Sequence, residues 1–180
     1  MQRRQFLTAA SAGVIAQLLT PAAMAQSADF WSLPRTVWLY RTATREQVRE
    51  TYFADGKIIW GGYERLCQIL RDTHANEAVE MSPVLLDILY GVQAWLAFNG
   101  IQRPLLTNSG YRTAWTNANT EGAARNSLHM EGRAWDGRVP GVATESLARF
   151  GLYLSGGGVG FYQAKNFVHL DDGRMRFWRG

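Results

Sequence analysis

The chain has 180 residues, of which 47% are hydrophobic and 19% are charged. This composition is typical of a globular protein with a sizeable core and excludes an intrinsically disordered chain. The formal net charge is +4, from 19 basic and 15 acidic residues. Two of the basic residues, Arg3 and Arg4, lie in the leader described next, which leaves 17 basic against 15 acidic side chains. A surplus this small and evenly spread argues against nucleic acid as a partner.

Residues 1–25 have the pattern of an export signal. Arg3 and Arg4 open a twin-arginine motif, an apolar run follows over residues 8–19, and residues 23–25 form a small-x-small cleavage site. The run is shorter and more polar than the roughly 20 apolar residues that a membrane span needs. We expect export to the periplasm by the twin-arginine route, with the general secretory route as the alternative. No stable membrane anchor is expected once the signal is removed.

Residues 26–34 are predicted to be an exposed lead-in, and residues 35–180 to form one domain. The expected strands cover residues 36–41, 46–53, 57–60, 103–108, 132–139, 159–162, 167–171 and 175–178. The expected helices run from just after residue 62 to about residue 72, over residues 83–98 and over residues 144–154. The pattern predicts an α+β fold with helices packed on a mainly antiparallel sheet.

Short local signals set several of these boundaries. Residues 46–53 are ambiguous, because their charges suit an exposed face, but the Asp55-Gly56 turn favours a hairpin that returns over residues 57–60. Ser82 is the expected N-cap of the clearest helix, with Pro83 at its first position. We expect Thr144 to cap the last helix, and the polar stretch before it, residues 114–126, to be a long functional loop.

Three features that could suggest chemistry have simpler explanations. Residues 155–158 are glycine-rich, but they lack the Gly-Lys-Ser/Thr ending of a phosphate loop and enter a strand, so a tight turn is expected. Cys67 is the only cysteine and falls on the apolar face of a helix, as a small buried hydrophobe does. His74 lies in a polar loop, where we expect it to be exposed.

The other two histidines have more specific surroundings. Asp136 follows His129 by seven positions, and His169 lies in the strand pattern of residues 167–171. Side chains alternate along a strand, so Asp136 and His169 converge if their strands are neighbours. Two imidazoles and one carboxylate are the minimum for an open zinc site. On spacing alone, a structural His–Asp hydrogen bond is the alternative.

Five motifs in a fixed order carry a family resemblance. They are Ser-Gly-Tyr-Arg-Thr at residues 109–113, Ser-x-His-x-x-Gly-x-Ala-x-Asp at 127–136, Gly-Gly-Val-Gly-Phe-Tyr at 157–162, Phe-Val-His-Leu-Asp at 167–171 and Arg-Phe-Trp at 176–178. Together they resemble the M15-type zinc peptidases, which have the hedgehog/DD-peptidase fold. The branch they resemble most is that of the MepK-like murein endopeptidases, once known only as a domain of unknown function. The resemblance covers about residues 35–180.

The resemblance implies one zinc ion per chain, with His129, Asp136 and His169 as its ligands. It also implies that Arg112 lines the substrate cleft and stabilises the oxyanion, a role that suits a fixed guanidinium. A surface salt bridge is the alternative for Arg112. Tyr111 and Asn117, from the same motif region, are expected to bind substrate. Ser127 is expected to orient the loop or the ring of His129.

The chain departs from the family pattern at the general base. Many relatives place a glutamate or histidine two or three residues before the last zinc histidine, where this chain has Phe167 and Asn166. Neither side chain takes up a proton. Asp171 shares a strand face with His169 and is the predicted base, with a turn-capping role as the alternative. Glu131 is a weaker candidate.

The predicted function is that of an exported zinc metallopeptidase. It would act on peptidoglycan peptides, cleaving cross-links as an endopeptidase or terminal residues as a carboxypeptidase. The rival hypothesis is a non-catalytic, zinc-containing module of the same fold that binds the cell wall. The missing upstream base is the feature that supports the rival.

Overall fold

The computed structural model describes residues 30–180, so the predicted export signal lies outside the described residues. Within this range, no helix has the length and apolar character of a membrane span. The strands are β1 (Arg35–Arg41), β2 (Gln47–Ala54), β3 (Lys57–Ile58), β4 (Leu105–Ser109), β5 (Ala134–Arg138), β6 (Gly158–Tyr162), β7 (Phe167–Asp171) and β8 (Arg176–Arg179). The helices are α2 (Trp60–Ile69), α3 (Pro83–Phe98), α4 (Ala114–Ala118) and α5 (Thr144–Leu154), with two 3-10 turns, η1 (Phe30–Ser32) and η2 (Leu128–Glu131).

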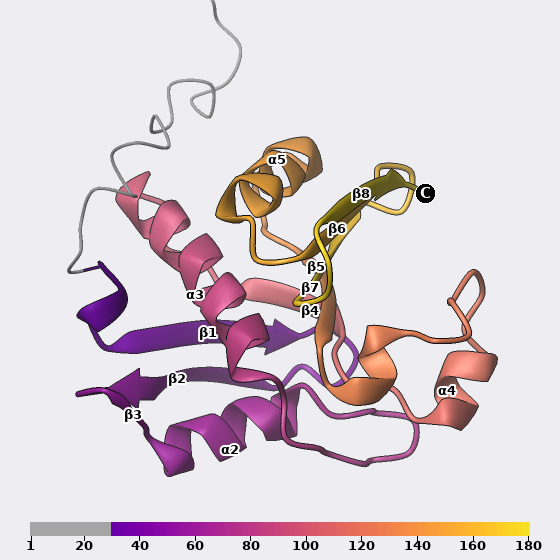
Figure 1. The fold of residues 1–180 in the computed structure, drawn as a ribbon, viewed down its shortest axis with the longest axis horizontal. Coiled ribbons are helices and arrows are strands. Elements are labelled where there is room, and N and C mark those ends of the chain that lie inside the picture. Colours follow the sequence, from indigo (N-terminus) through magenta and orange to yellow (C-terminus); the bar gives the residue numbers. More distant parts are fainter. Residues whose placement is uncertain (1–29) are drawn as a thin grey trace, which may run out of the picture.

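The strands form a single sheet in the order β3-β2-β1-β4-β5-β7-β6-β8. Only the pairs β1–β4 and β6–β8 are parallel among the described strands. Helix α3 lies across the sheet, α5 lies beside β6, and α4 stands apart from both (Figure 1). The predicted α+β fold with a mainly antiparallel sheet is therefore confirmed.

Strand alternation separates the core from the site. Trp135 in β5 and Val168 and Leu170 in β7 are fully or almost fully buried in the hydrophobic core, together with residues of α2, α3 and α5. Because side chains alternate along a strand, Asp136 and His169 point to the opposite face of the sheet. The core thus fixes the register that brings these two polar side chains together.

Helix α3 forms as predicted. The Ser82 side chain accepts a hydrogen bond from the Leu85 backbone N–H at 3.4 Å, and Pro83 occupies the first helical position. The predicted apolar stripe is buried, at Leu85, Ile88, Leu89, Val92 and Leu96. Burial of each such side chain stabilises the fold by roughly 1.5–3 kcal/mol, before the entropy cost of ordering is subtracted. Cys67 on α2 is buried as well.

The hairpin is confirmed, but its return strand is shorter than predicted. β3 ends at Ile58, and Trp60 already begins α2. The pair Gly61-Gly62, expected to separate the return strand from the helix, lies inside this helix. A Cβ atom at Gly62 would lie 2.1 Å from the Thr51 carbonyl oxygen, so glycine lets α2 pack directly on β2. The helix also ends earlier than predicted, at Ile69.

Two further predictions need correction. Residues 114–126 are not all loop, because α4 begins directly after Thr113, whose side chain accepts from the Thr116 N–H at 3.2 Å. Thr144 is the first residue of α5 and not its cap. Its hydroxyl instead donates to the Asn166 side-chain oxygen at 2.6 Å, which ties α5 to the β6–β7 turn.

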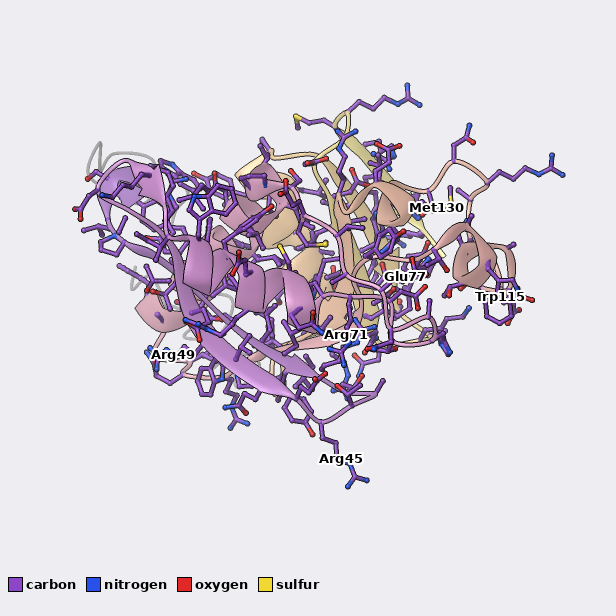
Figure 2. The ribbon with its side chains drawn as sticks, turned by 90° about the horizontal axis from the view of Figure 1, so that it is seen from below. Arg45, Arg49, Arg71, Glu77, Trp115 and Met130 are labelled. Carbon is purple, nitrogen blue, oxygen red and sulfur yellow. The ribbon has the colours of Figure 1, made fainter. Side chains whose placement is uncertain are left out.

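Arg45 and Trp115 are exposed side chains in two separate parts of the fold. Arg45, at the tip of the β1–β2 hairpin, has a left-handed backbone (φ 62°) and extends away from the fold (Figure 2). Trp115 on α4 is 68% exposed and likewise points outward. The predicted glycine-rich turn is found between α5 and β6, with Ser155 in the left-handed conformation.

Candidate metal centre

The three predicted ligand residues come together at the centre of the sheet. Asp136 in β5 pairs directly with His169 in β7, and η2 brings His129 to the same place. His129 Nε2 lies 3.2 Å from His169 Nδ1 and 3.2 Å from Asp136 Oδ2, while His169 Nδ1 lies 2.8 Å from Asp136 Oδ1. All three residues are buried. They are the only such cluster of potential metal ligands within residues 30–180.

The outer ring nitrogens decide which atoms face the centre. His129 Nδ1 lies 2.6 Å from the Gly110 carbonyl oxygen, which only accepts hydrogen bonds, so this nitrogen carries a proton and donates. His169 Nε2 donates to an Asp171 carboxylate oxygen at 2.8 Å in the same way. In the neutral rings, His129 Nε2 and His169 Nδ1 are therefore unprotonated, and their lone pairs converge with the carboxylate of Asp136.

The electrostatics of this cluster favour a cation at its centre. Burial alone would raise the pKa of Asp136, but His129 and His169 outweigh it and hold that pKa well below its usual range. Burial lowers the pKa of His129, which favours its neutral ring. The pKa of His169 is raised against the effect of burial, because the carboxylates of Asp136 and Asp171 lie on either side of its ring. The Asp136 carboxylate thus favours positive charge at this centre, such as that of a metal ion.

The donor set fits zinc. Neutral imidazole and carboxylate are common zinc ligands, at roughly 2.0–2.2 Å, and a tetrahedron with such bonds has edges of about 3.3–3.6 Å. The two separations from His129 Nε2, 3.2 Å to His169 Nδ1 and 3.2 Å to Asp136 Oδ2, are close to this edge length. The third, from His169 Nδ1 to Asp136 Oδ1, is shorter at 2.8 Å. Three ligands leave one tetrahedral position open, as in catalytic zinc sites.

The backbone of residues 110–112 supports His129. A Cβ atom at Gly110 would lie 2.3 Å from the Leu70 carbonyl oxygen, so only glycine allows this approach. The Tyr111 N–H donates to the same oxygen at 2.8 Å, and the Arg112 N–H donates to the His129 carbonyl at 3.1 Å. The motif Ser-Gly-Tyr-Arg-Thr therefore links the end of α2 to η2.

The Arg112 side chain reaches the centre itself. Its Nε donates to the Ser109 hydroxyl at 2.8 Å, and its Nη2 donates to Asp136 Oδ2. The guanidinium is largely buried, with 11% of its side chain exposed, and lines the cavity above the centre. Arg112 is therefore held in place by Ser109 and is not a surface salt bridge.

Asp171 lies behind His169, away from the cavity. Its side chain has no exposed surface, and its Oδ1 accepts from the Gly158 and Gly173 backbone N–H groups at 3.0 and 2.9 Å. Arg176 donates to both oxygens, at 3.0 and 2.6 Å. Burial alone would raise the pKa of Asp171, but the hydrogen bonds from His169 and Arg176 hold that pKa well below its usual range. The predicted role as general base does not fit this placement; the role of orienting His169 does.

The remaining predicted site residues lie around the centre. The Ser127 hydroxyl accepts from the His129 N–H at 3.4 Å and so caps η2. Asn117 is buried and donates to the Ala124 carbonyl at 2.9 Å, which supports the loop after α4 without lining the cavity. Tyr111 packs against the hydrophobic core, and Glu131 pairs with Arg133 at 2.9 Å. His74 is exposed, as predicted.

A cavity of about 440 Å³ opens on the centre. Arg112, His129, Asp136 and His169 line it, together with residues of two other segments. The first segment is the loop between α4 and η2, with Thr120, Glu121, Gly122, Ala123, Ala124, Asn126, Ser127 and Leu128. The second is the β6–β7 hairpin with β8, which contributes Tyr162, Lys165, Phe167, Arg176 and Trp178.

Several of these residues were not assigned a role from the sequence. Trp178 lies with its ring centroid 5.1 Å from that of His169, and its Nε1 donates to the Tyr162 hydroxyl at 3.0 Å. A Cβ atom at Gly160 would lie 2.6 Å from the Trp178 ring, so the glycine makes room for this contact. The Gly-Gly-Val-Gly and Arg-Phe-Trp motifs carried this signal. Lys165 and Glu121 have no comparable sequence signal.

A mainly antiparallel sheet that presents two histidines and an aspartate to a cavity defines a peptidase of the M15 type. The family described as peptidoglycan L,D-endopeptidase MepK matches residues 31–178, and the chain belongs to this family. Peptidoglycan L,D-endopeptidase MepK of Escherichia coli (strain K12) is 34% identical over 149 residues, which is 81% of this chain and 80% of that protein. The probable peptidoglycan L,D-endopeptidase MepK of Haemophilus influenzae is 35% identical over 121 residues, or 65% of this chain and 64% of that protein. No solved structure gave a significant match.

Proposed function

We propose that this protein is an exported zinc endopeptidase that cleaves peptide cross-links of peptidoglycan between an L and a D centre. One observation carries the proposal: the lone pairs of His129, His169 and Asp136 converge beside a cavity that Arg112 also lines. The family supports the substrate class, because its relatives are named as peptidoglycan L,D-endopeptidases. A bond between two diaminopimelate residues joins an L centre to a D centre, whereas a bond after D-Ala begins at a D centre. The named relatives therefore favour the former bond.

Three side chains would hold the metal, and each is itself held. His129 would bind through Nε2 and His169 through Nδ1, while Gly110 and Asp171 accept from their outer nitrogens. Asp136 would bind through its carboxylate, which Arg112 also contacts. When bound, zinc would polarise the scissile carbonyl and lower the pKa of an attacking water towards about 7.

Arg112 would stabilise the charge that develops on the carbonyl oxygen. The Ser109 and Asp136 contacts fix its guanidinium before substrate arrives, and a preorganised donor costs no reorganisation during the reaction. The cavity side formed by Tyr162 and Phe167, whose rings stack with centroids 4.5 Å apart, would place the peptide across the centre.

The export route belongs to the same proposal. Residues 1–25 contain the twin-arginine motif and the cleavage site, and substrate of this class lies outside the cytoplasm. Twin-arginine export carries folded proteins, which would allow the metal to be bound before translocation. Replacement of both Arg3 and Arg4 by lysine is expected to retain the protein in the cytoplasm; unchanged export would indicate the general secretory route.

Purified sacculi provide the main test. The protein is expected to contain about one zinc ion and to convert the cross-linked dimers of the sacculi into monomers. A chelator should abolish this change in muropeptide composition, and added zinc should restore it. Defined dimers linked between two diaminopimelates should be cleaved, while dimers linked through D-Ala should not. A zinc-loaded protein that binds sacculi but changes no muropeptide would instead support the non-catalytic wall-binding module.

A further inference from the structure

The charged groups around the cavity are mostly paired with one another. Arg112 donates to Asp136, and Arg176 donates to Asp171. Within residues 30–180, two charged side chains of the cavity lining form no ion pair or hydrogen bond: Glu121 and Lys165. The cavity therefore offers one free anion and one free cation to a ligand.

These two side chains come from separate segments with anchored backbones. Glu121 follows α4 in the loop that the Asn117 side chain holds at the Ala124 carbonyl, 2.9 Å away. Lys165 lies in the turn between β6 and β7. The next residue, Asn166, holds this turn through its N–H, which donates to the Gln163 carbonyl at 3.1 Å, and through the Thr144 hydroxyl.

Glu121 and Lys165 line the same cavity without pairing with each other. They form no ion pair with one another, so their charged atoms are more than 4 Å apart. A group that meets both must present a positive charge to Glu121 and a negative charge to Lys165. An amino acid head group, with an ammonium and a carboxylate on one carbon, has this charge arrangement.

We propose that Glu121 and Lys165 form a specificity site that binds the zwitterionic end of a diamino acid in the substrate peptide, with Glu121 facing its ammonium and Lys165 its carboxylate. This inference rests on the proposed function, because a cross-linked diaminopimelate leaves such an end free beside the scissile bond. The stacked rings of Tyr162 and Phe167 line the same cavity and would pack against the methylene groups that separate the two ends of the diamino acid.

Three versions of one cross-linked dimer test the assignment. They are the native dimer, a dimer whose free carboxylate is converted to carboxamide, and a dimer whose free ammonium is acetylated. The wild-type enzyme is expected to show a KM about two- to fivefold lower for the native dimer, the range of an ion pair open to solvent. Lys165→Met should lose the preference for the carboxylate but keep that for the ammonium, and Glu121→Gln should do the reverse.

Matched controls remove one charge elsewhere. Arg174→Gln removes an exposed cation, and Glu64→Gln an exposed anion, and neither residue lines the cavity. Both variants should keep the wild-type preferences. A wild-type enzyme that cleaves all three dimers equally overturns the specificity site, as does Lys165→Met with the preference for carboxylate intact.

Two further outcomes separate this inference from the proposed function. A fall in kcat at unchanged KM in Glu121→Gln would make Glu121 a group of the chemical step and overturn its assignment to substrate binding. A zinc-loaded wild-type enzyme that cleaves no dimer would overturn the proposed function, and this inference with it.

Discussion

Replacement of Asp171 by asparagine separates two roles for this residue. As the general base predicted from the sequence, Asp171 would be needed for the proton transfer and not for the metal. As the buried partner of His169, it would be needed for the metal, and the reaction would recover once metal is supplied. The two roles predict opposite behaviour when zinc is added in excess.

The expected loss of zinc affinity follows from the contacts of the Asp171 carboxylate. Oδ2 accepts from His169 Nε2 at 2.8 Å and from Arg176 Nη2 at 2.6 Å, and Oδ1 accepts from two backbone N–H groups as well as Arg176 Nη1. An amide group keeps one oxygen for the Oδ1 contacts and turns its NH₂ towards two donors. Two charge-assisted hydrogen bonds are lost, each worth about 1.5–3 kcal/mol. Zinc affinity is expected to fall about 10- to 100-fold.

Zinc titration of the metal-free protein against a chromogenic chelator measures this change. The muropeptide assay is then repeated at increasing free zinc. Asp171→Asn should approach wild-type kcat at saturating zinc, at a zinc midpoint shifted by the loss in affinity. Asp172→Asn is the control, because Asp172 is a neighbouring carboxylate that pairs with Arg133 at 2.7 Å and does not contact His169. Wild-type zinc affinity combined with lost activity in Asp171→Asn would refute the reasoning and restore Asp171 as the base.

Three other perturbations have defined outcomes. Arg112→Lys should lower kcat about 10²- to 10³-fold in the muropeptide assay, because one ammonium cannot replace the donors that Arg112 holds between Ser109 and Asp136; unchanged kcat would contradict the oxyanion role. Gly62→Ala should lower the melting temperature, because its Cβ would lie 2.1 Å from the Thr51 carbonyl oxygen. Gly56→Ala is the comparison: its Cβ would meet no atom within 4 Å, so it tests the effect of a left-handed backbone alone. Burial alone would raise the pKa of Asp72, but hydrogen bonds from Thr116, Thr113 and His74 hold it well below its usual range. Its stabilisation is complete above about pH 4 and is lost as pH falls towards the folded pKa, so wild type should lose stability to urea below pH 4 and Asp72→Asn should lose less.

Most of the sheet could be predicted because its signals are local. β7 matches the predicted residues 167–171 at both ends, and its alternation carries both the core and His169. The signals failed where a distant partner decides the outcome. Gly61-Gly62 reads as a helix breaker in isolation, and only the close approach of the Thr51 carbonyl explains why a glycine lies at position 62 inside the helix. Thr144 has the side chain of a cap, but Asn166 binds its hydroxyl.

At the candidate metal centre, too, local sequence signals predicted some features, while contacts between distant residues decided others. Register alone brings Asp136 opposite His169, so a prediction from strand alternation reached two of the three ligands. The role of Asp171 could not be reached in this way. Alternation correctly places it on the face of His169, but whether it meets solvent or is covered depends on Arg176 and the Gly158 N–H, which belong to other strands.

The C-terminal strand is therefore part of the candidate metal centre and not only the edge of the sheet. β8 runs parallel to β6, which brings Arg176 opposite Gly158 and Trp178 opposite Gly160. Both glycines leave room for these side chains, because a Cβ would lie 2.4 Å from the Arg176 guanidinium at Gly158 and 2.6 Å from the Trp178 ring at Gly160. Arg176 then reaches Asp171, and Trp178 reaches the ring of His169, both across β6 on the same face of the sheet. Two glycines in β6 thus let β8 orient the candidate metal ligand His169 in β7, the strand beyond β6.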